Sequence, residues 1–242
     1  MNETIQPEMT RVRVWDLPLR AFHWLLVAAV VAAVITGQIG GNLIDWHALT
    51  GTLVLGLVVF RVLWGFIGST YARFGQFLPR PAALWAYVTG HWRGVGHNPL
   101  GALSVLTIIV IVAIQVATGL FANDDIAFQG PLFDAVTKDF SDLMTTIHAI
   151  VFNVLLAFVG LHIGAIVYYA RAKRDNLVIP MITGYKTVPA DLVTSSRPAG
   201  WLRMLIALIL AVLVSWSVGS GWIVEQFVPP PVAQTPATVP GW

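Results

Sequence analysis

Five long apolar runs constrain the fold of this chain more than any other feature of its sequence. Four of them contain no Asp, Glu, Lys or Arg, and the fifth is interrupted only by Arg61. An apolar helix of about 20 residues spans the roughly 30 Å hydrocarbon core of a bilayer. The runs lack the alternation of a membrane β-barrel. We therefore predict an all-α polytopic membrane protein with spans at Ala21–Ile39, Trp46–Ile67, Leu100–Ala122, Leu143–Ala170 and Met204–Val224.

The distribution of charge predicts the orientation of these spans. Only 11% of the residues are charged, less than half of what soluble domains carry. All but one of the 14 Lys and Arg lie in residues 11–20, 61–93 and 171–203, whereas residues 123–142 carry five Asp and only Lys138. By the positive-inside rule, the N-terminus is cytoplasmic and the C-terminus external, which requires an odd number of spans. The sequence lacks the basic stripe that would indicate nucleic-acid binding.

The spans divide the chain into five parts. Residues 1–14 form a cytoplasmic arm, 15–185 a four-helix membrane domain, and 186–203 a basic cytoplasmic linker. Residues 204–224 form a fifth membrane helix, and 225–242 a proline-rich external tail. In the long connection between the second and third spans, we expect a short amphipathic helix at the membrane interface.

Four histidines lie in or at the edges of the first four runs, where an ionisable side chain is costly and usually functional. His148 and His162 share the fourth run and are 14 residues apart. In an α-helix this places them about 21 Å apart along the axis and within roughly 40° of one face. His23 enters the first span from the inside and matches His162 in depth. His47 enters the second span from the outside and matches His148.

Two facing imidazoles are what a haem iron needs as axial ligands, and such a pair leaves no open position for oxygen. We therefore predict two b-type haems, the cytoplasmic-side one held by His23 and His162 and the external-side one by His47 and His148. A single interfacial histidine is as readily a polar side chain that reaches the headgroups, so the matched depths carry the inference. Since the chain has no Cys, thiolate-bound clusters and covalently attached haem are excluded.

Small residues allow helices to approach a flat porphyrin, and close helix packing is the alternative explanation for each of them. The candidate haem-packing glycines are Gly37, Gly51, Gly56, Gly119, Gly160 and Gly164.

Arg61 lies 14 residues after His47 and so reaches the depth of the cytoplasmic pair. It either pairs with a haem propionate or extends to the interface. We expect His91 and His97, in the polar connection, to be solvated. A quinone site is not located by the sequence, and the polar candidates by depth are Arg61, His97 and Asn98 on one side and Asn123 and Asp124 on the other.

With these residues in hand, the chain resembles the bacterial cytochrome b561 family, which includes the b-type cytochrome subunits of nickel–iron hydrogenases. The resemblance covers roughly residues 11–185. The motifs that carry it are RVWDLPLRAFHW at 13–24, DWHALTG at 45–51, FRVLWGFIGS at 60–69, GHNPLG at 96–101 and TGLFANDD at 118–125, with the two histidines of the fourth span.

The resemblance implies a diheme four-helix core in the bacterial inner membrane, with His23, His47, His148 and His162 at the family's ligand positions. It implies electron transfer between the quinone pool, ubiquinone or menaquinone, and a periplasmic partner such as a c-type cytochrome, a hydrogenase or another dehydrogenase. One alternative is a stand-alone superoxide:quinone oxidoreductase, which the acidic external face disfavours. A second is a haem-free transporter or assembly protein.

Overall fold

The computed structural model describes residues 8–126, 128–193 and 197–227, and five of its helices are long and apolar enough to cross a membrane. They are α1 (Leu17–Ile39), α2 (Ile44–Ile67), α5 (Pro99–Gly119), α6 (Lys138–Arg171) and α8 (Trp201–Gly219). These helices confirm the predicted all-α polytopic class. The expected tail 225–242 lies almost wholly outside the described residues.

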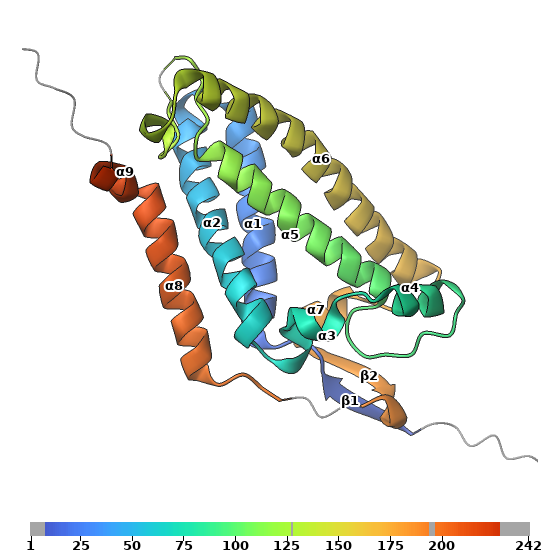
Figure 1. Ribbon diagram of the computed structural model, residues 1–242. Helices are drawn as coiled ribbons and strands as arrows, with labels where there is room; N and C mark the ends of the chain where they lie inside the picture. Colours follow the sequence, from blue (N-terminus) through green and yellow to red (C-terminus); the bar gives the residue numbers. More distant parts are fainter. Residues whose placement is uncertain (1–7, 127, 194–196, 228–242) are drawn as a thin grey trace, which may run out of the picture.

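The first four spans form a bundle in which α1 packs on α2, α2 on α5, and α5 on α6 (Figure 1). Buried apolar side chains at its centre join all four helices. They are Ala29, Val54, Val58, Ile111, Val112, Val116 and Leu155. At 34 residues, α6 is about 50 Å long and extends beyond a bilayer core.

The ends of these helices follow from their capping residues. The Asp16 carboxylate accepts the Leu19 amide (2.8 Å) and starts α1, and Asn98 caps α5 through the Gly101 amide (2.7 Å). Gly40 ends α1 with a φ of 62°, which suits glycine and gives the tight turn to α2. These caps fix where each span enters the bundle.

The fifth span, α8, lies beside α2 on the side away from α5 and α6 (Figure 1). The Ser215 hydroxyl donates to the Thr52 carbonyl (2.6 Å), and a Cβ on Gly56 would come within 3.2 Å of Ser215. Small residues at every fourth position of α8 face this contact and let the backbones approach. They are Ala207, Ala211, Ser215 and Gly219.

One end of the bundle, here called the basic end, carries residues 8–16, 68–98 and 172–200. The strands β1 (Met9–Arg13) and β2 (Tyr185–Pro189) pair there as an antiparallel ribbon, with Met9 opposite Pro189 and Arg13 opposite Tyr185. The short helices α3 (Phe74–Phe77), α4 (Pro81–Val88) and α7 (Val178–Thr183) lie at the same end. The opposite, acidic end carries residues 40–45 and 120–142, and α9 (Trp222–Phe227) follows α8 there.

Candidate functional site

The structure brings the rings of His47 and His148 together near the acidic end. Their ring centroids are 6.1 Å apart and their planes are nearly perpendicular, at 85°. An imidazole nitrogen lies about 2 Å from a metal that it binds, so two rings on opposite sides of one iron have centroids roughly 6 Å apart. The spacing of this pair therefore suits a single metal between the rings.

Hydrogen bonds to neighbouring helices fix which ring nitrogen of each histidine carries the proton. His47 Nδ1 lies 2.8 Å from the Ala33 carbonyl of α1, and His148 Nδ1 lies 2.9 Å from the Gln115 carbonyl of α5. A carbonyl only accepts, so each Nδ1 is the protonated nitrogen and each Nε2 keeps its lone pair. This is the bond that histidine ligands of metals usually make with their second nitrogen.

The side chain of Gln115 supports the same assignment, because its Nε2 amide lies 2.9 Å from His148 Nε2 and donates to the lone pair there. The Thr118 hydroxyl also contacts His148 Nδ1, at 3.2 Å. Sequence reasoning missed both residues. The available signal was that Gln115 is the only amide side chain between Leu100 and Ala122.

A largely apolar cavity of about 570 Å³ surrounds the His47 and His148 pair and is lined by all four core helices. Two glycines leave room for the rings. A Cβ on Gly37 would come within 2.7 Å of His47 Nδ1, and a Cβ on Gly119 within 2.9 Å of His148 Cε1. Any side chain at these positions would displace a histidine.

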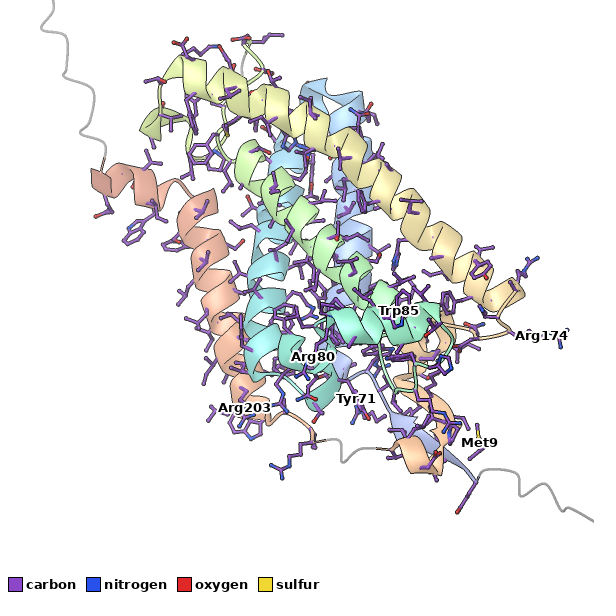
Figure 2. The ribbon with its side chains drawn as sticks, turned by 45° about the vertical axis from the view of Figure 1, so that its right-hand side comes forward. Met9, Tyr71, Arg80, Trp85, Arg174 and Arg203 are labelled. Carbon is purple, nitrogen blue, oxygen red and sulfur yellow. The ribbon has the colours of Figure 1, made fainter. Side chains whose placement is uncertain are left out.

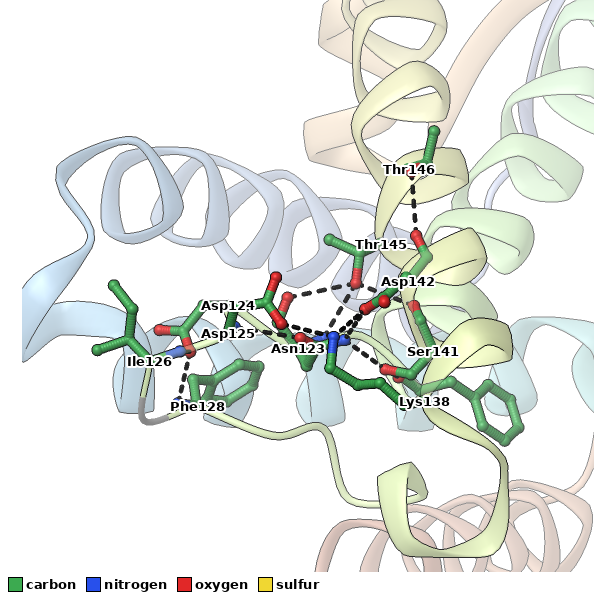
Figure 3. Close-up of polar contacts among 11 residues, drawn as sticks. Asn123, Asp124, Asp125, Ile126, Phe128, Lys138, Ser141, Asp142, Thr145 and Thr146 are labelled. Carbon is green, nitrogen blue, oxygen red and sulfur yellow. Dashed lines mark hydrogen bonds and ion pairs between the residues drawn. The ribbon is translucent and has the colours of Figure 1, made fainter.

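The segment that closes the acidic end of this cavity is held to α6 through Asn123 (Figure 3). The Asn123 side-chain amide donates to Ser141 Oγ (2.7 Å) and Asp142 Oδ1 (2.9 Å), and its backbone amide donates to Thr145 Oγ1 (3.0 Å). Its side-chain oxygen accepts the Asp125 amide (3.1 Å). Asn123 is therefore fully engaged in holding the loop.

The second pair, His23 and His162, lies nearer the basic end. The two imidazoles are close enough to interact electrostatically, and both are half-buried. The His23 ring meets Trp24 edge-on at 5.1 Å, and its Nδ1 is shielded from solvent without a hydrogen-bond partner among the described residues. The two pairs are thus held differently, one by carbonyls of adjacent helices and the other without such a bond on His23.

The other candidate glycines lie in different surroundings. Gly51 lines the cavity of the acidic-end pair, with nothing within 4 Å of a Cβ built there. Gly56 packs against α8 through Ser215. Gly160 and Gly164 are exposed with open space around them, and each lies about 200° around the helix from His162. They therefore face away from the histidine face of α6.

Arg61 is buried at the basic end, with only 1% of its surface exposed. Its guanidinium lies 4.7 Å from the centre of the Phe74 ring, and its Nη1 is 3.4 Å from the Ala72 carbonyl. Its Nη2 is shielded and has no hydrogen-bond partner in the described part of the chain. It does not extend to solvent, which leaves a buried donor for an anionic group.

The expectation that His97 is solvated is wrong. Its ring packs between Trp15 and Phe77, with centroid distances of 4.5 and 4.7 Å. Burial, with a smaller contribution from the positive charge of Arg61, lowers the pKa of His97 to about 3. His91, by contrast, is exposed. The sequence did not show that residues 70–77 fold back over this connection.

A polar network that the sequence did not indicate joins α4, α5 and α6 at the basic end. The hydroxyls of Tyr87 and Tyr169 hydrogen-bond to each other, and Asn98 Nδ2 donates to the Tyr169 hydroxyl at 2.8 Å. Since the other amide atom of Asn98 caps α5, this side chain is engaged in the structure at both atoms. Its position thus ties α4 to the membrane helices.

These observations fit haem at the acidic-end pair. Two imidazoles that each keep a lone pair on Nε2 line an apolar cavity, and Gly37 and Gly119 leave room where a Cβ would collide. At the basic-end pair, His23 and His162 supply the same donor set. A second pair of imidazoles is therefore present in the other half of the bundle.

The sequence model of the family described as prokaryotic cytochrome b561 matches residues 14–184, more than half of the chain. The chain is also similar to proteins described as a probable Ni/Fe-hydrogenase B-type cytochrome subunit. It is 24% identical to that of Rhodobacter capsulatus over 75% of this chain and 84% of the relative. It is 26% identical to that of Azotobacter chroococcum over 76% of this chain and 92% of the relative.

The corresponding protein of Bradyrhizobium diazoefficiens is 25% identical over 72% of this chain and 85% of the relative. No solved structure gives a significant match. The family match spans all four histidines and the helices that position them. This chain therefore belongs to the prokaryotic cytochrome b561 family, multi-pass membrane proteins that carry haem b and transfer electrons.

Proposed function

We propose that this chain is a diheme cytochrome that carries electrons across the bacterial inner membrane, between a quinone at the basic, cytoplasmic end and a redox protein at the acidic, periplasmic end. The observation that carries the proposal is the placement of two histidine pairs at different depths of one four-helix bundle. His47 and His148 form one pair, at 6.1 Å, and His23 and His162 form the other.

In this proposal, each histidine would hold a haem iron through its Nε2, and a bound haem would supply a one-electron carrier. The chain's own part is to hold and orient the imidazoles. The carbonyls of Ala33 and Gln115 keep the protons of His47 and His148 on Nδ1, and the apolar cavity wall excludes water. Because the protein would supply two ligands to each iron, the site would favour electron transfer over oxygen binding.

Arg61 is proposed to hold a propionate of the basic-end haem. Its Nη2 is buried and lacks a partner among the described residues, and a guanidinium pairs strongly with a carboxylate. Two aromatic rings, Phe74 and Phe77, lie against the guanidinium and limit its movement. The buried charge of Arg61 is thereby given a counter-ion.

The acidic end favours a basic protein partner. Lys138 contacts both Asp125 and Asp142 at 2.5 Å, so the one basic residue within 120–142 is already neutralised. No free positive side chain of this described segment is left to attract an anion such as superoxide. The curated relatives are named as hydrogenase cytochrome subunits, which supports an oxidoreductase subunit as the partner.

Haem content and reduced-minus-oxidised spectra of the purified wild type, His148→Ala and His162→Ala test the proposal. We expect two haems in the wild type and one in each variant, with a different spectral component lost in each. A wild type with one haem, or a variant that keeps both, would contradict the pairing. Protein without haem would contradict the electron-transfer function altogether.

A further inference from the structure

A pocket of about 420 Å³ opens at the basic end, between the end of α2 and the start of α8. Arg73, Arg197 and Arg203 line it, and no acidic side chain is among its described lining residues. Within the described chain, none of these three arginines forms an ion pair. The pocket therefore gathers three positive charges without a counter-ion from the protein.

The backbone around this pocket is held in place. The Arg197 amide donates to Thr70 Oγ1 (2.9 Å), and the Thr70 amide donates to the Arg197 carbonyl (3.3 Å). Arg73 Nε is shielded from solvent and has no hydrogen-bond partner in the described residues. A pocket with a fixed wall and a buried, unused donor is suited to binding an anion.

The first turn of α8 adds to the positive potential. The helix begins after Gly200, and no side chain in the described region caps it. Gly200 and Leu202 both line the pocket, so the free amides of this turn lie beside the arginines. The positive end of a 19-residue helix dipole thus reinforces the three guanidinium groups.

The position of the pocket relative to the membrane indicates where its ligand comes from. It lies at the start of a membrane-spanning helix, and Figure 2 shows Arg203 at that end of α8, the end of the bundle that also carries Arg80 and Arg174. Beside it, Trp201 is 74% exposed and Phe66 of α2 is 68% exposed. Exposed aromatic residues at a span end lie at the level of the lipid headgroups, with apolar helix surface adjoining them.

We propose that this pocket binds the phosphate of an anionic phospholipid, with the arginines on the phosphate and the acyl chains along the outer faces of α2 and α8. Basic pockets between membrane helices bind anionic headgroups by this charge pairing. A lipid phosphate is preferred to a soluble anion because the polar pocket continues directly into apolar, exposed surface. The site is separate from the histidine pairs and does not depend on haem ligation.

The test uses the full-length, haem-loaded protein in detergent and native mass spectrometry with added phosphatidylglycerol, phosphatidylcholine or inorganic phosphate. The pocket variant is Arg197→Gln with Arg203→Gln, both exposed side chains. The matched control is Arg80→Gln with Arg174→Gln, which removes the same charge at the same end outside the pocket. Circular dichroism verifies that each variant is folded, and Arg203→Gln alone provides a milder change.

We expect the wild type and control to bind phosphatidylglycerol in preference to phosphatidylcholine. Each arginine near a headgroup contributes about fivefold, so the pocket variant should bind phosphatidylglycerol roughly 30-fold more weakly and Arg203→Gln about fivefold. Equal losses in the pocket and control variants would overturn the proposal, because they would show only a general charge effect. Inorganic phosphate binding as tightly as the lipid would overturn it in favour of a soluble anion.

Discussion

An alanine at Gly37 or Gly119 is expected to displace a histidine of the acidic-end pair. A Cβ at Gly37 would lie 2.7 Å from His47 Nδ1 and 2.9 Å from its Cε1. At Gly119, it would lie 2.9 Å from His148 Cε1 and 3.2 Å from Nδ1. Carbon contacts settle at roughly 3.5–4.0 Å, so either ring must move by several tenths of an ångström or more.

That movement disturbs the hydrogen bonds that orient the two rings. His47 and His148 are oriented by contacts of 2.8 and 2.9 Å to backbone carbonyls, each worth about 1 kcal/mol. Adding one carbon to a packed site costs about 1–3 kcal/mol. If this cost falls on the haem-bound form, the affinity of the acidic-end site for haem drops roughly 5- to 150-fold.

The assay is a haem titration, followed by absorbance, of apoprotein that also carries His162→Ala, so that only the acidic-end site is read. Gly160→Ala is the matched control, because Gly160 is exposed on α6 and a Cβ there meets nothing within 4 Å. We expect weakened binding with Gly37→Ala or Gly119→Ala and unchanged binding with Gly160→Ala. Unchanged affinity in both test variants, or an equal loss in the control, would refute the reasoning.

Three further predictions concern other parts of the molecule. The pKa of His97 is about 3 in the folded protein and about 6.5 in the unfolded chain, so the unfolded state binds more protons between these values. The free energy of unfolding therefore decreases as the pH is lowered through this range, by about 1.4 kcal/mol per pH unit. The melting curves of the wild type and His97→Phe should therefore converge as the pH is lowered from 6.5 to 4.5, while those of His91→Phe follow the wild type. Parallel behaviour of the wild type and His97→Phe would argue against a buried neutral His97. Ala211→Leu, at a site 4% exposed on the α2–α8 contact, should cost about 1–3 kcal/mol and lower the Tm with haem content unchanged, and an unaltered Tm would disprove this packing. Because the chain has no Cys, an impermeant thiol reagent should label Asp134→Cys in intact spheroplasts and Arg93→Cys only after lysis, and the reverse pattern would invert the proposed topology.

The membrane helices were predictable because their signal is local. The fourth span begins earlier than predicted, since Thr137 caps α6 and the polar turn from Lys138 is still helical. The fifth span ends earlier than the predicted Val224, because Gly221, with a φ of 73°, interrupts the helix between α8 and α9. Hydropathy locates apolar length well, but the helix ends depend on capping and on glycine conformation.

Contacts between distant segments were not predictable in the same way. β1 pairs with β2 although almost the whole membrane domain lies between them in the sequence, and no short motif in either strand specifies the other. The burial of His97 depends on Phe77, which comes from a separate short helix. Matched depth did predict that His47 and His148 would lie together, because depth follows directly from position along a spanning helix.

The different surroundings of the two histidine pairs predict different haem potentials. His47 and His148 each donate Nδ1 to a carbonyl, which makes the imidazole a stronger donor and stabilises oxidised iron, whereas His23 has no such bond among the described residues. The buried cation Arg61, as the proposed propionate partner, instead favours reduced iron at the basic end. The basic-end haem should therefore have the higher potential, and electrons should move downhill from the acidic end. A loss of about 1.4 kcal/mol of electrostatic stabilisation of the reduced iron corresponds to about 59 mV for one electron. In a redox titration, Arg61→Gln should therefore lower the midpoint potential of the higher-potential haem alone, by tens of millivolts. A shift of the lower component, or no shift, would contradict this assignment.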